Sequence, residues 1–253
     1  MSSSSRIALV TGGSRGIGRA TVLALAGRGL DVIFTYRAEA AAAAEVVRLA
    51  EASGVRARAM ALDTGEISAF PAFVEAVRGA LEAWSASGLD VLVNNAGNSH
   101  HAPFGQVTEA DFDALYRVHL KGVFFLTQAL LPLIRDGGRI VNVSSGLTRF
   151  AMPGSSAYGS IKGAVEVLTR YMARELGARG IAANVVAPGA VETDFSGGMV
   201  RDNPDINRMV AQGTALGRAG LPDDIGPMIA SLVGEESRWI NGQRIEVSGG
   251  MAL

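Results

Sequence analysis

Short apolar segments alternate with longer segments of helical periodicity along almost the whole chain. We expect strands at 7–10, 32–35, 57–61, 91–93, 139–143, 182–187 and 244–247, and helices between them, for example at 40–52, 70–83, 109–131 and 157–176. Such alternation predicts βαβ units, whose right-handed crossovers build a parallel sheet. The pattern therefore predicts an α/β fold, a doubly wound parallel sheet with helices on both faces.

The composition agrees with one large domain. Hydrophobic residues make up 48% of the 253 positions and charged residues 19%, which suits a sheet buried on both faces. We expect a single domain over 1–253, because α/β folds of about 250 residues commonly form one unit. We expect residues 1–5 to be disordered, and the length and glycine content of residues 193–220 predict a lid over the substrate.

Charge and cysteine content exclude several classes of function. The formal net charge is -1, so bulk charge favours neither nucleic acid nor an anionic membrane. A chain without cysteine has no disulfide, thiolate nucleophile or cysteine-bound zinc, and we predict no metal site. We find neither a secretory signal pattern nor a run of about 18 apolar residues, so we expect a cytoplasmic protein.

A glycine-rich turn at 11–18 follows the first strand and opens a helix. Gly12 permits the tight turn, and Gly16 and Gly18 let the backbone approach a phosphate. The helix N-terminus then offers free N–H groups to a pyrophosphate. The alternative is a plain tight turn, but the position between strand and helix favours a dinucleotide site. We predict that this site includes Gly12, Ser14, Arg15, Gly16, Ile17 and Gly18.

The end of the second strand bears on which dinucleotide binds. Sites for NAD place an acid there to hold the ribose 2′-hydroxyl, but this chain reads Phe-Thr-Tyr-Arg at 34–37, with no acid before Glu39. Arg37 and Arg15 can pair with a 2′-phosphate from two sides. The sequence thus favours NADP; the alternative is that Arg37 is only a solvated residue at a helix start.

Tyr158 and Lys162 lie four residues apart on a predicted helix and so share a face. An ammonium near a phenol favours the phenolate and lowers the phenol pKa, so the pair can exchange a proton with a substrate oxygen. Ser145 follows the predicted strand 139–143, at the sheet edge where ligands bind, and its hydroxyl can hydrogen-bond the same oxygen. Ser144 is the alternative donor, and either serine could instead cap its loop.

Taken in order, these motifs resemble the short-chain dehydrogenase/reductase family in its compact single-domain form. They are the turn at 11–18, Asn-Asn-Ala-Gly at 94–97, Ser145, Tyr158 with Lys162, and Pro188-Gly189 with Thr193. The resemblance implies a Rossmann-type sheet of seven strands. It also implies that Ser145 orients a carbonyl, that Tyr158 is the acid/base, and that Lys162 holds the nicotinamide ribose and lowers the Tyr158 pKa.

The resemblance implies further cofactor contacts and an assembly. Asp63 would contact the adenine, and Arg37 matches members that prefer NADP. Relatives of this type are mostly tetramers, so a homotetramer is implied. The remaining residues implied along the cofactor are Asn95, Ala96, Gly97, Pro188, Gly189, Val191 and Thr193.

Two positions depart from the family pattern. His119 stands where the family has an asparagine whose backbone holds a water that feeds the lysine. It could be a tolerated replacement, it could join or gate the proton supply and add a titration near pH ~6.5, or it could impair catalysis. We count it among the candidate catalytic residues. Ser248 stands where the family commonly has aspartate, in a segment that usually lies at a subunit interface.

The sequence constrains the identity of the substrate less than it constrains the type of reaction. Phe195, Met199, Met209 and Val210 could form an apolar lid, and His100, His101, Phe104 and Phe150 could line the opening, which together suggest a moderately apolar small-molecule carbonyl substrate. The chain most resembles 3-oxoacyl-(acyl carrier protein) reductases and general ketone or aldehyde reductases. Arg135, Arg139 and Arg179 could meet an acidic carrier protein or be merely solvated. The main hypothesis is a carbonyl reductase using NADPH; the alternatives are a sugar or polyol dehydrogenase working oxidatively and a non-catalytic NADP sensor.

Overall fold

All seven predicted strands are present in one parallel sheet. The computed structural model describes residues 5–253, so of the segment expected to be disordered, residues 1–4 lie outside the described part. The strand order is β3-β2-β1-β4-β5-β6-β7, which confirms the doubly wound prediction. The strands are β1 (Ile7–Val10), β2 (Asp31–Tyr36), β3 (Ala57–Ala61), β4 (Leu89–Asn94), β5 (Ile134–Val143), β6 (Ala182–Pro188) and β7 (Arg244–Val247).

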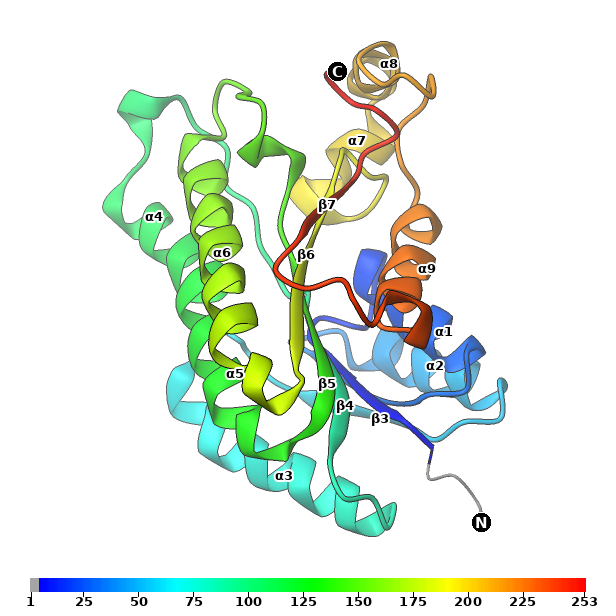
Figure 1. Ribbon diagram of the computed structural model, residues 1–253. Helices are drawn as coiled ribbons and strands as arrows, with labels where there is room; N and C mark the ends of the chain where they lie inside the picture. The colour runs from blue at the N-terminus through cyan, green and yellow to red at the C-terminus, as the bar shows by residue number, and fades with distance from the viewer. Residues whose placement is uncertain (1–4) are drawn as a thin grey trace.

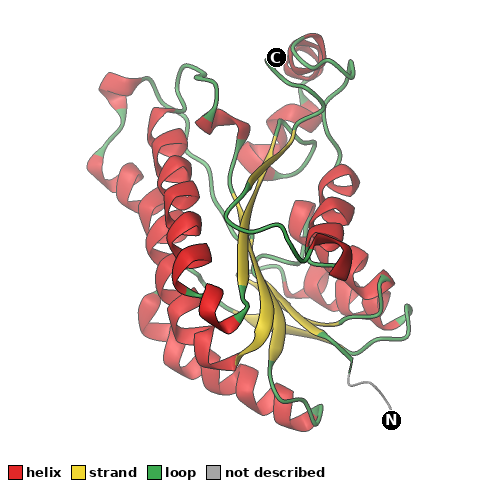
Figure 2. Cartoon of the chain, in the orientation of Figure 1, coloured by secondary structure: helices red, strands yellow, loops and turns green. Residues whose placement is uncertain are grey.

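Helices cover both faces of the sheet, as Figures 1 and 2 show. One layer packs α3 (Phe70–Ala83), α5 (Val123–Leu130) and α6 (Ser156–Glu175) against the sheet. The other layer contains α1 (Gly16–Gly27), α2 (Ala40–Glu51) and α9 (Pro222–Leu232). Among residues 5–253, no helix has both the length and the apolar character that crossing a membrane requires.

Burial on both faces explains why the central strands are almost continuously apolar. Every residue of β1 is buried, and so is every residue of β6. The edge strands are more open, because β3 and β7 each have a neighbour on one side only. The apolar sequence segments are therefore the interior of the sheet, and the sheet places the ends of its strands at fixed positions.

The predicted helix at 109–131 is interrupted. It divides into α4 (Glu109–Tyr116), a π-helical turn (Arg117–Gly122) and α5. The loop after β3 approaches this turn closely, since a Cβ on Gly122 would lie 2.1 Å from the Thr64 carbonyl oxygen. π-helical turns insert one extra residue and often occur at functional sites. Here the turn contains His119.

The segment at 193–220 lies beyond the carboxyl end of β6, where Figure 1 shows α7 and α8 above the sheet. It contains a short 3-10 turn (Phe195–Gly198), α7 (Met199–Asp202) and α8 (Pro204–Gln212). Isolated β-bridges fasten both of its ends, from Val191 to Gly220 and from Thr214 to Met251. The segment is thus a small helical layer above the carboxyl edge of the sheet.

Candidate active site

A cavity of about 680 Å³ opens at the carboxyl ends of the central strands, where open α/β sheets bind ligands. Its walls come from the glycine turn, from the loops after β2, β4, β5 and β6, and from the helical segment above them. The sequence-predicted site residues all line it: Gly12, Ser14, Arg15, Gly16, Ile17, Gly18, Arg37, Asp63, Asn95, Ala96, Gly97, His119, Ser145, Tyr158, Lys162, Pro188, Gly189, Val191 and Thr193.

The glycine turn is held against the end of β4. The Thr11 hydroxyl oxygen accepts hydrogen bonds from the backbone N–H groups of Asn95 (2.9 Å) and Ala96 (3.0 Å), and the Asn95 amide donates to the Thr11 carbonyl (2.9 Å). Gly12 has φ +67°, and a Cβ on Gly18 would lie 2.0 Å from the Gly12 carbonyl oxygen. Glycine is therefore required at both positions, for the left-handed turn and for the close approach of α1 to it.

Two guanidinium groups lie at the outer end of the cavity. Arg37 follows β2 and is exposed, and Arg15 lies in the glycine turn, with 59% of its side chain exposed. The Arg15 Nη1 lies 3.8 Å from a carboxylate oxygen of Asp194 in the segment above. Glu39 also lines the cavity, one residue before α2. The geometry thus presents two cations to an anionic group at this end.

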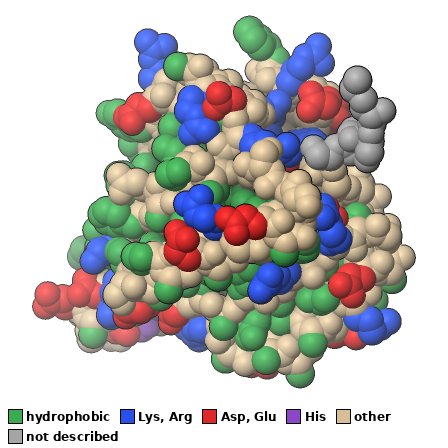
Figure 3. Space-filling model, turned by 90° about the horizontal axis from the view of Figure 1, so that it is seen from below, with side chains coloured by type: hydrophobic (Ala, Val, Ile, Leu, Met, Phe, Trp, Pro, Cys, Tyr) green, Lys and Arg blue, Asp and Glu red, His purple; other side chains and the backbone are tan. Residues whose placement is uncertain are grey.

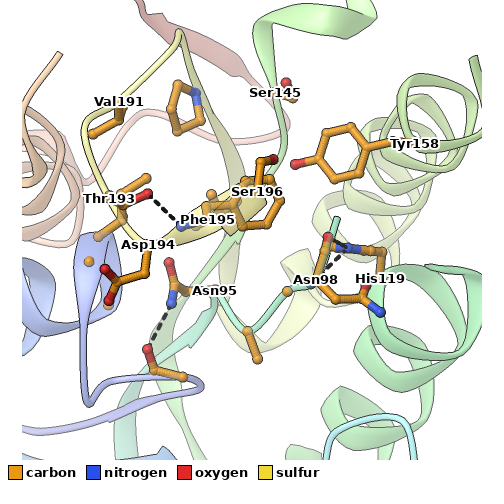
Figure 4. A pocket seen from close by; sticks show the side chains of 18 of the residues that line it. Asn95, Asn98, His119, Ser145, Tyr158, Val191, Thr193, Asp194, Phe195 and Ser196 are labelled. Carbon is orange, nitrogen blue, oxygen red and sulfur yellow. Dashed lines mark hydrogen bonds between the residues drawn. The ribbon is translucent and has the colours of Figure 1, made fainter. Parts of the chain in front are cut away.

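Tyr158 and Lys162 extend from the first turns of α6 into the inner end of the cavity. Figure 4 shows the Tyr158 hydroxyl pointing into the cavity near Ser145 and Phe195. Desolvation raises the Tyr158 pKa above its ordinary value, and a hydrogen bond with Ser145 opposes that rise. Desolvation thus outweighs the groups that favour the phenolate, and the net shift of the Tyr158 pKa is upward, opposite to the lowering that we predicted. The phenol is protonated at neutral pH, which suits a proton donor.

Burial affects Lys162 in the opposite sense. Its side chain is 5% exposed, and Nζ donates a hydrogen bond to the Val143 carbonyl oxygen at 2.8 Å. Burial lowers the pKa of Lys162 to about 7. The ammonium lies 5.7 Å from the centre of the Tyr158 ring. Lys162 thus changes its charge near neutral pH at the inner end of the cavity.

The two serines after β5 have separate partners. The Ser144 hydroxyl is buried and donates to Glu166 Oε1 at 2.8 Å. The Ser145 hydroxyl accepts a hydrogen bond from the Leu147 N–H at 3.2 Å and lies near the Tyr158 hydroxyl. Because the Ser144 proton is already used, the geometry favours Ser145 as the group that meets a substrate oxygen.

His119 is almost wholly buried, with 1% of its surface exposed. Its Nε2 lies 2.7 Å from the Asn98 carbonyl oxygen, its ring meets Tyr158 edge-on at 5.2 Å, and its Nδ1 has no protein partner. Burial, with the nearby Lys162 charge, holds the pKa of His119 well below its ordinary value. The titration near pH 6.5 that we considered is thus contradicted, because charging the ring would require desolvating a cation beside another cation.

Beyond Tyr158, the part of the cavity farthest from Arg37 is apolar. Of the residues expected there, Phe195, Met199, Met209, Val210, His101 and Phe150 line it. His100 and Phe104 do not: the His100 Nδ1 lies 3.4 Å from Asp111, and Phe104 is 86% exposed. Sequence reasoning does not identify several other wall residues, because no motif marks them and only the tertiary fold brings them to the cavity. These are Leu147, Met152, Pro153, Val200, Ile206 and Met251.

The three arginines considered for a carrier protein lie away from the cavity, in the first part of β5 and just before β6. Arg135 pairs with Asp90, Arg179 pairs with Asp136, and Arg139 is 8% exposed and donates to backbone carbonyls. Basic and acidic side chains stand side by side on this face (Figure 3). These arginines therefore serve the fold and offer no free docking site near the cavity.

Comparison with known proteins agrees with the geometry. A family model described as "Enoyl-(Acyl carrier protein) reductase" matches residues 12–252. A hydroxynaphthalene reductase-like protein of Metarhizium brunneum is 35% identical over 97% of this chain and 94% of its own. Other relatives are named as short-chain dehydrogenases. The chain belongs to the short-chain dehydrogenase/reductase family. It is therefore an oxidoreductase by family.

Two solved structures share both the fold and much of the sequence. The promiscuous reductase LugOII, which catalyses keto-reduction at C1 during lugdunomycin biosynthesis, has a TM-score of 0.92 and 40% identity, over 98% of each chain. The angucycline C-6 ketoreductase LanV with bound NADP has a TM-score of 0.92 and 40% identity, over 98% of this chain and 95% of its own. The Rossmann-type fold is thus confirmed at this level of identity.

Proposed function

We propose that the protein is an NADPH-dependent reductase that converts a ketone or aldehyde to an alcohol. The observation that carries this proposal is the meeting of Ser145, Tyr158 and Lys162 at the inner end of one cavity whose outer end carries Arg15 and Arg37. NADPH, when bound, supplies the hydride for the carbonyl carbon. The protein must then hold the carbonyl oxygen and deliver a proton to it.

In the proposed reaction Tyr158 gives its phenolic proton to the substrate oxygen as the carbonyl becomes an alkoxide. Ser145 donates a hydrogen bond to the same oxygen and fixes its position. Lys162 lies beside the ring, and its cationic form stabilises the phenolate that remains. Tyr158 is protonated at neutral pH, so it can supply the proton that a carbonyl reduction requires.

The outer end of the cavity supports NADP rather than NAD. Arg37 and Arg15 offer two guanidiniums to a 2′-phosphate, and the residue that ends β2 is Tyr36 rather than an acid. The pyrophosphate would lie at the N-terminus of α1, against the glycine turn. Asp63 would meet the adenine, and Asn95 and Thr193 would lie along the nucleoside. NADP in the relative LanV is consistent with this assignment.

The apolar end of the cavity supports a bulky, flat ketone as substrate. Four methionines, Met152, Met199, Met209 and Met251, share this end with Phe150 and Phe195. Methionine adapts its shape to irregular apolar groups and packs favourably on aromatic rings. Relatives named for hydroxynaphthalene and angucycline ketones point the same way. These methionine and phenylalanine side chains offer a sugar or polyol no strong hydrogen-bond partner, which weighs against the oxidative alternative. The segment at 193–220 would act as the lid over this ketone.

His119 fits a structural part in this scheme. The neutral imidazole joins the π-helical turn to the backbone of Asn98 and packs on the edge of Tyr158. We propose that it fixes this wall and does not transfer protons.

A tetrameric, cytoplasmic protein remains part of the proposal. Apolar side chains exposed on α4, α5 and α6 support an assembly through these helices: Phe112, Tyr116, Phe124, Phe125, Val167 and Tyr171.

A carbonyl panel followed by NADPH absorbance tests the function. We expect 2-tetralone and larger fused-ring ketones to be reduced with higher kcat/KM than acetoacetyl thioesters or small sugars. Saturable binding of NADPH with no turnover of any carbonyl would instead favour the non-catalytic sensor, and faster oxidation of polyols with NADP would favour the oxidative alternative.

A further inference from the structure

A network of charged side chains lies behind the loop that carries Ser145. Glu166 stands one helical turn after Lys162 and two after Tyr158, so the three share one face of α6. Its side chain is 13% exposed, and Arg244, at the start of β7, is 24% exposed. The Arg244 Nε donates to Glu166 Oε1 at 2.8 Å. The pair therefore links the catalytic helix to the last strand beneath the Ser145 loop.

Both residues contact the chain immediately around Ser145. Ser144 donates to Glu166 Oε1 at 2.8 Å, and the Thr148 hydroxyl lies 2.7 Å from the same oxygen. The Thr148 hydroxyl is also 2.9 Å from the Ser145 carbonyl oxygen, and the Arg244 Nη2 lies 3.4 Å from that carbonyl. Ser145 is thus held through its own backbone and through the side chains on either side of it.

The network continues to the C-terminus. Arg244 Nη1 donates to a Glu246 carboxylate oxygen at 2.9 Å, and Arg149 donates to both carboxylate oxygens of Glu246 at 2.7 Å. Arg149 also donates to the Ala252 carbonyl oxygen at 2.9 Å. The neighbouring Met251 forms part of the cavity wall. The same charges therefore fix the serine loop and the end of the chain that closes the apolar side of the cavity.

We propose that Glu166 and Arg244 are positioning residues that set the orientation of the Ser145 hydroxyl for the carbonyl. Neither side chain lines the cavity, so each acts through the serine loop. The inference rests on the proposed function of Ser145. Small displacements of a group that meets the reacting atoms can lower rates by about 100-fold. A shift of this loop should therefore affect the chemical step and leave cofactor binding intact.

Two variants weaken the network while keeping its volume. Glu166→Gln removes the negative charge. Arg244→Lys replaces a planar guanidinium, which contacts oxygens of Glu166, Glu246 and Ser145, with a single ammonium. We expect each to lower kcat for the ketone by about 10- to 100-fold, with the Kd of NADPH unchanged. Asp31→Asn is the matched control, since it weakens the ion pair between the buried Asp31 carboxylate and the partly exposed Arg56, at the amino end of β2 and away from the cavity. It should reduce the melting temperature but not kcat.

A double-mutant cycle with Ser145→Ala separates positioning from general destabilisation. If Glu166 acts through Ser145, Glu166→Gln should cause at most a 2-fold further loss of kcat once Ser145 is alanine. An undiminished loss in that background would overturn the inference, and so would parental kcat in both Glu166→Gln and Arg244→Lys. If Glu166→Gln does not fold, the same cycle is run with Arg244→Lys. Parental turnover in Ser145→Ala alone would contradict both the proposed function and this inference.

Discussion

Replacing Lys162 by methionine should make the cofactor-free protein more stable and should abolish turnover. Burial lowers the Lys162 pKa from 10.5 to about 7 in the folded protein. Between these two values the unfolded chain holds a proton that the folded protein lacks, so the free energy of unfolding rises with pH. With at most 1.36 kcal/mol per pH unit, stability should increase by about 2 kcal/mol from pH 7 to pH 9 because of this residue.

Urea unfolding at pH 7, 8 and 9, at fixed protein concentration and without NADPH, measures this effect. The advantage of Lys162→Met over the parent should be about 4 kcal/mol at pH 7, less the lost hydrogen bond to Val143, and should shrink by about 2 kcal/mol at pH 9. Lys121→Met is the matched control, because Lys121 lies on the π-helical turn and is only half-buried. Parallel pH curves for the parent and Lys162→Met would refute the argument that burial makes Lys162 titrate near neutral pH.

Three other substitutions test other parts of the site. Arg37→Ala should raise the KM for NADPH about 10- to 100-fold and leave the KM for NADH unchanged, because only the 2′-phosphate loses a partner; equal effects on both cofactors would argue against that contact. His119→Asn should give the same pH–rate profile as the parent between pH 5.5 and 7.5, since the His119 pKa lies well below its ordinary value. If the parent profile has an ionisation that the variant lacks, His119 takes part in the proton relay. Gly18→Ala should abolish NADPH binding, measured by fluorescence, because its Cβ would meet the Gly12 carbonyl.

The sheet could be predicted because its physical cause is local. Strands buried on both faces must be apolar along their length, so β1, β4 and β6 could be recognised without knowing their neighbours. The cofactor residues could be found for a similar reason. Gly12 and Gly18 satisfy backbone requirements that few other residues meet.

Other features depend on contacts between distant segments. The π-helical turn at Arg117–Gly122 packs closely against the loop after β3, and the periodicity of residues 109–131 alone does not predict it. Met251 reaches the cavity because Arg149 holds the end of the chain, 102 residues away in sequence. The pKa values of Tyr158 and Lys162 follow from burial, which spacing alone does not reveal. Their raised and lowered values therefore had to come from the folded structure.

The central claim is that Tyr158 gives its proton to a carbonyl oxygen in an NADPH-dependent reduction. The most direct measurement is the single-turnover rate of NADPH oxidation with a saturating fused-ring ketone, in the parent and in Tyr158→Phe. Tyr158→Phe should bind NADPH with the parental Kd and reduce the ketone at least about 1,000-fold more slowly, since general acid catalysis contributes about 100- to 10,000-fold. A Tyr158→Phe rate within 10-fold of the parent would contradict the account.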